Sequence, residues 1–173
     1  MQQPTEYEDT KVYRLPPIKD GQVDDLLQAL QKTGIDINRR RKTCGVGRSQ
    51  CFGVVRRGPY GIGEVNNNEK HPELYRLLRK LGDEIVPFGY DAIQVNHNYQ
   101  TLPHRDKNNY GHSVIVSLGN YKGGNLVINN ESHSTHLHPL VFNGSLLEHY
   151  NTEIEGDKYS IVFFRNRPSK RQA

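Results

Sequence analysis

The sequence has little of what several protein classes depend on. Its 173 residues include two cysteines, one methionine and no tryptophan, and the mean hydropathy is −0.78. Two cysteines, Cys44 and Cys51, cannot build the disulfide framework of a small secreted domain. We therefore expect an intracellular protein from a reducing compartment, the nucleus or the cytoplasm.

Long apolar runs are also missing. No stretch reaches the ~20 apolar residues that a membrane-spanning helix needs, and residues 1–4 have neither the basic nor the apolar region of a signal peptide. The length suits one domain. We expect that domain over residues 21–166, with a polar N-terminal arm over residues 1–20 and a basic tail over residues 167–173. A monomer without membrane contact is the expected state.

Positive charge is in modest excess and is unevenly distributed. The net charge is +4 and the isoelectric point is about 9.0. Basic residues gather at positions 39–42, at Arg56 and Arg57, and in the tail at Arg165, Arg167, Lys170 and Arg171. Such clusters suit a polyanion such as nucleic acid. The alternative is a solvated surface with a disordered tail.

Hydrophobic periodicity predicts helices only in the first half of the chain. Apolar residues recur at helical spacing over residues 23–32 and again over residues 72–81, and Gly34 and Gly82 are expected to end these helices. Residues 39–68 are basic and rich in glycine and asparagine. We expect them to form a loop with one short strand at residues 51–55.

The second half predicts a series of short strands. Alternating or apolar runs lie at residues 92–99, 113–118, 125–128, 137–142 and 159–164. Glycine, asparagine and proline turns separate them, without long helices between, which is typical of an antiparallel sandwich or barrel. The predicted fold class is α+β, mainly β.

A histidine and a carboxylate follow the first of these strands. His104 and Asp106 are two positions apart, so both side chains project to the same side of extended chain, and His149 comes later. Two imidazoles and one carboxylate form the facial triad of non-haem Fe(II) oxygenases, which leaves positions open for a co-substrate and O₂. Zinc hydrolases use similar ligands, and a polar turn is the alternative for the His-x-Asp pair.

A cation and a hydroxyl open the last strand. Lys158 and Ser160 share one face of it, and together they match a carboxylate. A buried lysine needs an anion, because an unpaired ammonium in a β core is costly. The far carboxylate of 2-oxoglutarate would provide it. The alternative is an exposed lysine at the turn after Asp157.

The order His104-x-Asp106, His149 and Lys158-x-Ser160 resembles the Fe(II)/2-oxoglutarate dioxygenase superfamily. The resemblance implies a double-stranded β-helix, or jelly roll, with supporting N-terminal helices. It also implies Fe(II), 2-oxoglutarate and O₂ as cofactor and co-substrates. Most members carry arginine where Lys158 stands, and lysine occurs in some branches, including prolyl hydroxylases.

A closer similarity begins at the same motif. Residues 104–109 and 111–116 look like the TET/J-binding-protein branch, which oxidises the methyl group of 5-methylcytosine or thymine in DNA. Residues 119–126 resemble its Gly-Gly-x-Leu turn and strand, and residues 47–49 resemble the upstream segment whose arginine holds the co-substrate. The large Cys-rich zinc-binding region of animal TET enzymes is absent from this sequence.

The resemblance assigns three further residues. Arg48 would contact the keto-acid end of 2-oxoglutarate, His138 would line the co-substrate site, and Asn109 would hydrogen-bond a flipped base. A surface cation is the alternative for Arg48, and a turn asparagine is the alternative for Asn109.

The function expected from these residues is hydroxylation of a methyl group on a nucleic-acid base, with DNA preferred over RNA. One alternative is a protein hydroxylase of the prolyl type on the same fold. The other is a catalytically silent nucleic-acid-binding domain.

Overall fold

The computed structural model describes residues 9–35, 45–56 and 62–168. Several residues singled out in the sequence lie outside these ranges. They are Cys44, the basic run 39–42, Arg57, Lys170 and Arg171.

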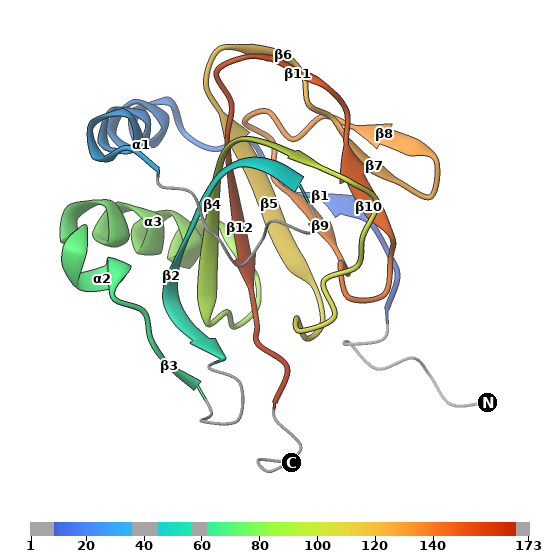
Figure 1. Cartoon of the computed structure of the whole chain (residues 1–173), viewed down its shortest axis with the longest axis horizontal. Helices are drawn as coiled ribbons and strands as arrows, with labels where there is room; N and C mark the ends of the chain where they lie inside the picture. The colour runs from blue at the N-terminus through green and yellow to red at the C-terminus, as the bar shows by residue number, and fades with distance from the viewer. Residues whose placement is uncertain (1–8, 36–44, 57–61, 169–173) are drawn as a thin grey trace.

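Three helices and twelve strands make up the described part of the chain (Figure 1). The helices are α1 (Asp20–Thr33), α2 (Asn67–Lys70) and α3 (Pro72–Ile85). The strands are β1 (Tyr13–Arg14), β2 (Gly45–Arg56), β3 (Ile62–Glu64), β4 (Ala92–Thr101), β5 (Ser113–Leu118), β6 (Tyr121–Gly123), β7 (Leu126–Ile128), β8 (Glu131–His133), β9 (Leu140–Phe142), β10 (His149–Asn151), β11 (Ile154–Gly156) and β12 (Tyr159–Phe164).

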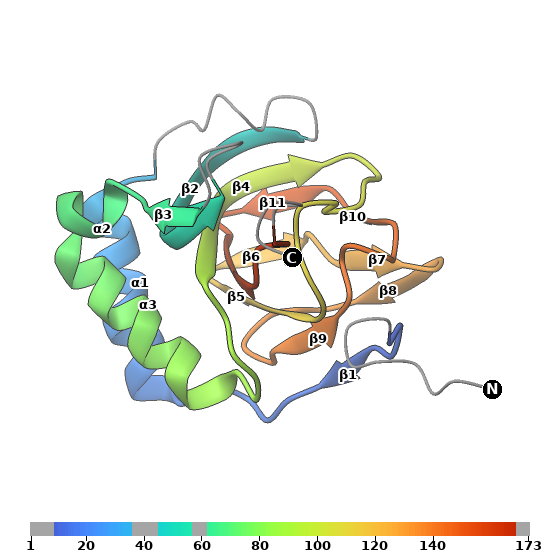
Figure 2. The ribbon, with the colours of Figure 1, turned by 90° about the horizontal axis from the view of Figure 1, so that it is seen from below.

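The strands form one large antiparallel sheet and two small ones. The large sheet has seven strands in the order β1-β9-β5-β12-β4-β2-β3, and the small sheets are β10-β7-β8 and β11-β6. Figure 2 shows α1 and α3 side by side along one face of the large sheet. We call this face the outer face and the opposite one, toward β7 and β10, the inner face. This mainly-β α+β architecture is the predicted class.

The outer face carries the main hydrophobic core. Alternate residues of β4, β5 and β12 point toward the helices and are fully buried, among them Val95, Val116 and Phe163. The helices meet them with leucines at helical spacing, such as Leu74, Leu78 and Leu81 of α3. Burial of each such side chain stabilises the fold by roughly 1.5–3 kcal/mol.

The intervening residues of the same strands point to the inner face. A second, smaller apolar cluster lies there, where Ile115, Leu140 and Phe142 of the large sheet pack against Leu126 and Ile128 of β7. The two layers are therefore joined by apolar contacts at one end. The rest of the inner face is free to carry polar side chains.

The predicted helix over residues 23–32 is confirmed as α1, which Gly34 follows with a φ of 71°. The second helix passes through Gly82 and continues to Ile85, so the predicted end at Gly82 is wrong. A Cβ at this position would lie 2.4 Å from the hydroxyl oxygen of Tyr90 and 2.6 Å from a ring carbon of Phe163. Gly82 is thus required for close packing and does not terminate the helix.

The prediction of a loop with one short strand over residues 39–68 is also wrong for its described part, because residues 45–56 form the twelve-residue strand β2. Its glycines were the misleading signal. A Cβ on Gly47 or Gly53 would lie 2.5 Å from a backbone carbonyl oxygen of the segment containing β4, and both have positive φ angles. These glycines allow β2 to pair closely with β4.

The segment before α1 packs against the domain. β1 pairs with β9 at the edge of the large sheet, and Ile18 is buried in the main core. No helix in the described ranges has the length and apolar character to cross a membrane.

Candidate active site

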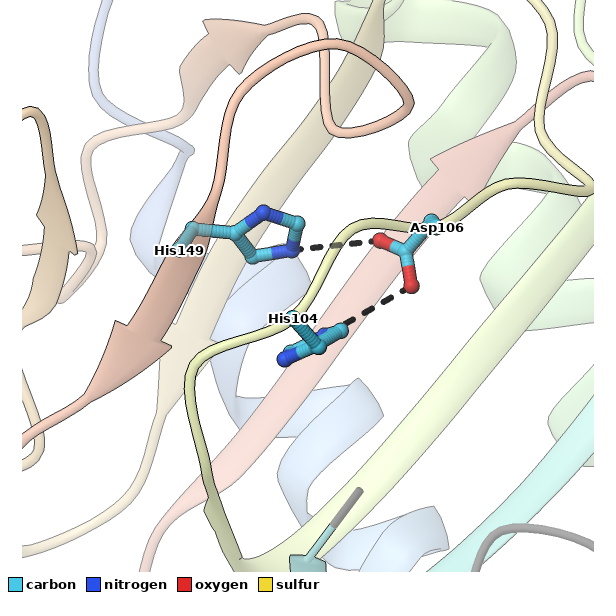
Figure 3. Close-up of side chains that lie close together, drawn as sticks. All are labelled: His104, Asp106 and His149. Carbon is cyan, nitrogen blue, oxygen red and sulfur yellow. Dashed lines mark ion pairs between the residues drawn. The ribbon is translucent and has the colours of Figure 1, made fainter. Parts of the chain in front are cut away.

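Three side chains with metal-ligating atoms meet on the inner face. His104 and Asp106 lie in the segment after β4, and His149 begins β10 (Figure 3). The backbones of the two histidines pair, with the N–H of each donating to the carbonyl of the other at 3.0 and 2.9 Å. The N–H of Asp106 donates to the Gly144 carbonyl at 2.8 Å. These main-chain bonds bring two distant parts of the sequence to one point.

The three ligand atoms are arranged to share one cation. The Nε2 atoms of His104 and His149 lie 3.5 and 3.2 Å from the two carboxylate oxygens of Asp106, and one ligand atom from each residue lies within 4.8 Å of the others. The ring atom Nδ1 of each histidine is hydrogen-bonded to the backbone carbonyl two residues earlier. The distance is 2.7 Å from His104 to Leu102 and 2.8 Å from His149 to Leu147.

Those carbonyl bonds hold the proton of each neutral imidazole on Nδ1 and leave a lone pair on Nε2. Two nitrogen lone pairs and a carboxylate that converge in this way repel one another unless a cation lies between them. The set has the donor types of an Fe(II) facial triad. The residues present therefore fit the metal that the sequence predicted.

A glycine allows the triad to assemble. A Cβ on Gly144 would lie 3.0 Å from Oδ2 of Asp106 and 3.1 Å from Cε1 of His149. Any side chain here would press directly on two of the three ligands. No sequence pattern singles out this glycine, because a glycine that follows a strand is typical of a turn.

Lys158 lies in the same cavity and has an unusual environment. The cavity has a volume of about 540 Å³ and is lined by the triad, Lys158 and Ser160 among others. The Lys158 ammonium is buried, donates to the Gly124 carbonyl at 2.6 Å and lies 5.6 Å from the centre of the Tyr121 ring. Burial lowers the pKa of Lys158 to about 8. Within the described residues, no carboxylate pairs with it.

Hydroxyl groups surround the place next to this lysine. Ser160 and Thr135 line the cavity, and the Ser117 hydroxyl hydrogen-bonds both of them, at 3.1 and 2.7 Å. Burial also raises the pKa of the nearby Tyr121. The sequence identified Ser160 by its strand position but missed Thr135, which comes from the irregular segment after β8. A cation beside several hydroxyls is suited to hold a carboxylate.

Two residues assigned by resemblance lie elsewhere. Arg48 is exposed, pairs across the sheet with His97, and donates to the Ile35 carbonyl at 3.3 Å. Strand alternation puts it on the face opposite Asn96, which lines the cavity. His138 is exposed just before β9 and does not line the cavity. The geometry therefore does not give either residue the predicted contact with 2-oxoglutarate.

Asn109 does line the cavity, and it also borders a second one. This second cavity, which we call the side recess, has a volume of about 420 Å³. It is lined by Cys51, Val55, Gln94, Asn108, Asn109, Phe164 and Asn166. Four of these residues, Gln94, Asn108, Asn109 and Phe164, line the main cavity as well. The side recess therefore adjoins the triad.

No family model and no curated protein sequence matches the chain, but solved structures do. The fold is similar to that of NgTET1 in complex with 5mC DNA, with a TM-score of 0.68 and 16% identity over 93% of this chain and 74% of that one. An oxidoreductase of the 2OG-Fe(II) oxygenase family from Burkholderia pseudomallei is similar with a TM-score of 0.59 and 17% identity, over 94% of this chain and 88% of that one. A Pseudomonas putida prolyl-4-hydroxylase is similar with a TM-score of 0.56 and 12% identity, over 95% of this chain and 97% of that one.

These structures share the jelly-roll arrangement predicted from the sequence, and the similarity at this level of identity concerns the fold. The triad is an observation on this chain itself. Fold and triad together imply Fe(II), 2-oxoglutarate and O₂. The chain has the 2-oxoglutarate–Fe(II) dioxygenase fold with an intact His-x-Asp…His facial triad.

Proposed function

We propose that the protein is an Fe(II)- and 2-oxoglutarate-dependent oxygenase that hydroxylates a methyl group on a nucleic-acid base. The observation that carries this proposal is one cavity that holds both the triad and a buried lysine without a carboxylate partner among the described residues. A metal site and an anion site in one cavity suit a co-substrate that chelates a metal at one end and carries a carboxylate at the other.

The protein's contribution is to hold and orient these groups. Bound Fe(II) would supply, with O₂ and 2-oxoglutarate, the oxidation of a C–H bond, leaving succinate and CO₂ as co-products. His104, Asp106 and His149 would hold the metal on one side only. Lys158 and Ser160 would bind the far carboxylate of 2-oxoglutarate. Apolar side chains also line the cavity; they are Ile115, Leu126, Phe142 and Val162.

Basic residues near the cavity support a nucleic-acid substrate. Arg105 and Lys107 line the cavity and are exposed. Arg167 lies beside them, since its Nε donates to the Lys107 carbonyl at 3.1 Å and its backbone N–H donates to the Asn108 carbonyl at 2.8 Å. Positive charge around an opening would bind phosphates without reading sequence, and a base would enter after flipping out of a duplex or from a single strand.

The similarity to a TET structure solved with 5mC DNA supports DNA over RNA as the substrate. Hydroxylation of a prolyl peptide is the second candidate. It is favoured by the similarity to a prolyl-4-hydroxylase and by a lysine at position 158. A silent nucleic-acid-binding domain is disfavoured, because binding alone does not require three converging ligands.

Mass spectrometry on a substrate panel tests the proposal. The protein would be incubated with Fe(II) and 2-oxoglutarate together with methylated DNA, methylated RNA or a proline-containing peptide. We expect a base to gain the mass of one oxygen atom, with succinate formed in step, and the Asp106→Ala variant to form neither. An oxidised peptide with unchanged bases would replace the proposal by the prolyl-hydroxylase function. Nucleic-acid binding without any turnover would support the silent domain.

A further inference from the structure

The side recess contains a glutamine whose amide is held in one orientation. Gln94 of β4 is 9% exposed and lines both the main cavity and the side recess. Its Nε2 donates to the hydroxyl of Ser49 on β2. That hydroxyl in turn donates to Oδ1 of Asn96 at 2.7 Å. The three residues form a directed hydrogen-bond relay behind the cavity wall.

The direction of the relay decides what Gln94 presents to a ligand. A serine hydroxyl has one proton, and here Asn96 accepts it, so Ser49 can only accept from Gln94. The amide nitrogen of Gln94 therefore faces β2. Its carbonyl oxygen Oε1, to which no described residue donates a hydrogen bond, is the group left for the two cavities.

The walls of the side recess suit a flat, polar ring. Phe164 offers an aromatic surface on which a base can stack, and Val55 adds an apolar contact. The side-chain amides of Asn108 and Asn109 offer donors and acceptors to the ring edge. These are the features of a site for a nucleobase that has left its helix.

We propose that Gln94 makes this site selective for a methylated pyrimidine with an exocyclic amino group, as in 5-methylcytosine, over thymine. The inference rests on the proposed function and names the base. Cytosine carries an amino donor at C4, whereas thymine carries a carbonyl acceptor there. An acceptor fixed in the wall of the site accepts a hydrogen bond from the amino group of cytosine and repels the carbonyl oxygen of thymine.

The position of Gln94 also directs the methyl group. Gln94 lies on the boundary between the side recess and the cavity that holds the triad. The methyl group at C5 is next to C4 on the ring. A hydrogen bond from the C4 amino group to Gln94 therefore places the neighbouring methyl group toward the metal ligands.

A paired-substrate assay tests the inference. Two oligonucleotides that differ only in one unpaired base, 5-methylcytosine or thymine, would compete for the enzyme loaded with Fe(II) and 2-oxoglutarate, and mass spectrometry would quantify both oxidised bases. We expect the wild type to prefer 5-methylcytosine on the order of tenfold or more. The Ser49→Ala variant frees the amide to rotate, so its preference should fall toward equality, chiefly because thymine oxidation rises.

Ser113→Ala is the matched control. Ser113 is also a buried serine of the large sheet, and its hydroxyl has no hydrogen-bond partner in the described part of the chain. It should keep the wild-type preference. Gln94→Met, which removes the acceptor at similar length, should lose the preference by slowing 5-methylcytosine oxidation.

If the wild type oxidises thymine at least as fast as 5-methylcytosine, the inference is overturned and the proposed function stays in place. An unchanged preference in Ser49→Ala would have the same consequence. If neither base is oxidised and a peptide is, the proposed function fails and the inference fails with it. Fluorescence anisotropy with the same oligonucleotides gives a second readout, in which the preference should appear as tighter binding of 5-methylcytosine.

Discussion

Both faces of the seven-stranded sheet carry buried side chains, but only the inner face adds buried polar groups to the apolar ones. On the outer face, β5 and β12 present side chains such as Val114, Val116 and Ile161, all fully buried against the helices. On the inner face, the same strands and the turn before β12 present Ser117 and Lys158, which are also buried.

Buried polar groups cost stability unless they are paired. The outer face therefore stabilises the fold, and the proposed ligand accounts for the buried polar groups of the inner face. Substitutions on the two faces should accordingly separate activity from stability.

The largest expected effect is on the inner face. His149→Ala removes a proposed metal ligand that makes no contribution to the main core. Turnover of 2-oxoglutarate should fall on the order of a thousandfold or more, while circular dichroism and the melting temperature stay close to those of the wild type. Near-normal turnover in this variant would show that the ligand assignment is wrong.

The opposite pattern is expected on the outer face. Phe163 is fully buried and meets Tyr90 edge-on, with ring centres 5.3 Å apart. Phe163→Ala should lower the free energy of unfolding by about 3–5 kcal/mol, measured by urea denaturation. Below its melting temperature the variant should keep its affinity for the metal. A specific loss of metal binding from a folded Phe163→Ala protein would contradict the separation of the two faces.

Gly144→Ala tests whether the metal centre depends on close approach. The added methyl group would press on Asp106 and His149, so metal affinity should fall about ten- to hundredfold. Calorimetric titration with Mn²⁺ would measure the change. Gly89→Ala is a suitable control, since a Cβ there would meet nothing within 4 Å.

The smallest effect is expected at Lys158, where a substitution should raise the stability of the ligand-free protein and not lower it. Its pKa is lowered from 10.5 to about 8 in the fold, so the unfolded chain binds the proton more tightly than the folded one. The ligand-free protein should therefore gain stability as the pH rises from 8 toward 10.5. Lys158→Met should remove that gain and should stabilise the ligand-free protein at neutral pH by roughly 1–3 kcal/mol.

Thermal unfolding of the wild type and Lys158→Met across this pH range would measure the effect. The tyrosines with raised pKa values, Tyr90, Tyr121 and Tyr159, are common to both proteins, so the difference between the two curves reports Lys158. Identical curves would place the ammonium in solvent.

Sequence alone predicted the parts of the molecule that depend on local pattern. Strand periodicity placed Lys158 and Ser160 on one face, and the His-x-Asp spacing with His149 identified the triad, because alternation fixes the direction of a side chain. The same periodicity predicted α1 almost to its ends.

What the sequence could not predict depends on contacts between distant segments. Gly82 was predicted to end a helix and Gly144 was not singled out, but each is required because a side chain from elsewhere in the chain packs against it. Arg48 was assigned to the co-substrate by resemblance, whereas the register of β2 against β4 turns it away from the cavity. The relay from Gln94 through Ser49 crosses two strands whose pairing only the fold reveals.

Binding of 2-oxoglutarate to the Mn²⁺-loaded protein tests the central claim, that the triad and Lys158 form one site on the inner face. Calorimetry should detect binding that requires the metal, and Lys158→Met should weaken it at least about tenfold, because a charge-assisted hydrogen bond contributes roughly 1.5–3 kcal/mol. Equal binding without the metal, or equal binding by Lys158→Met, would contradict the account.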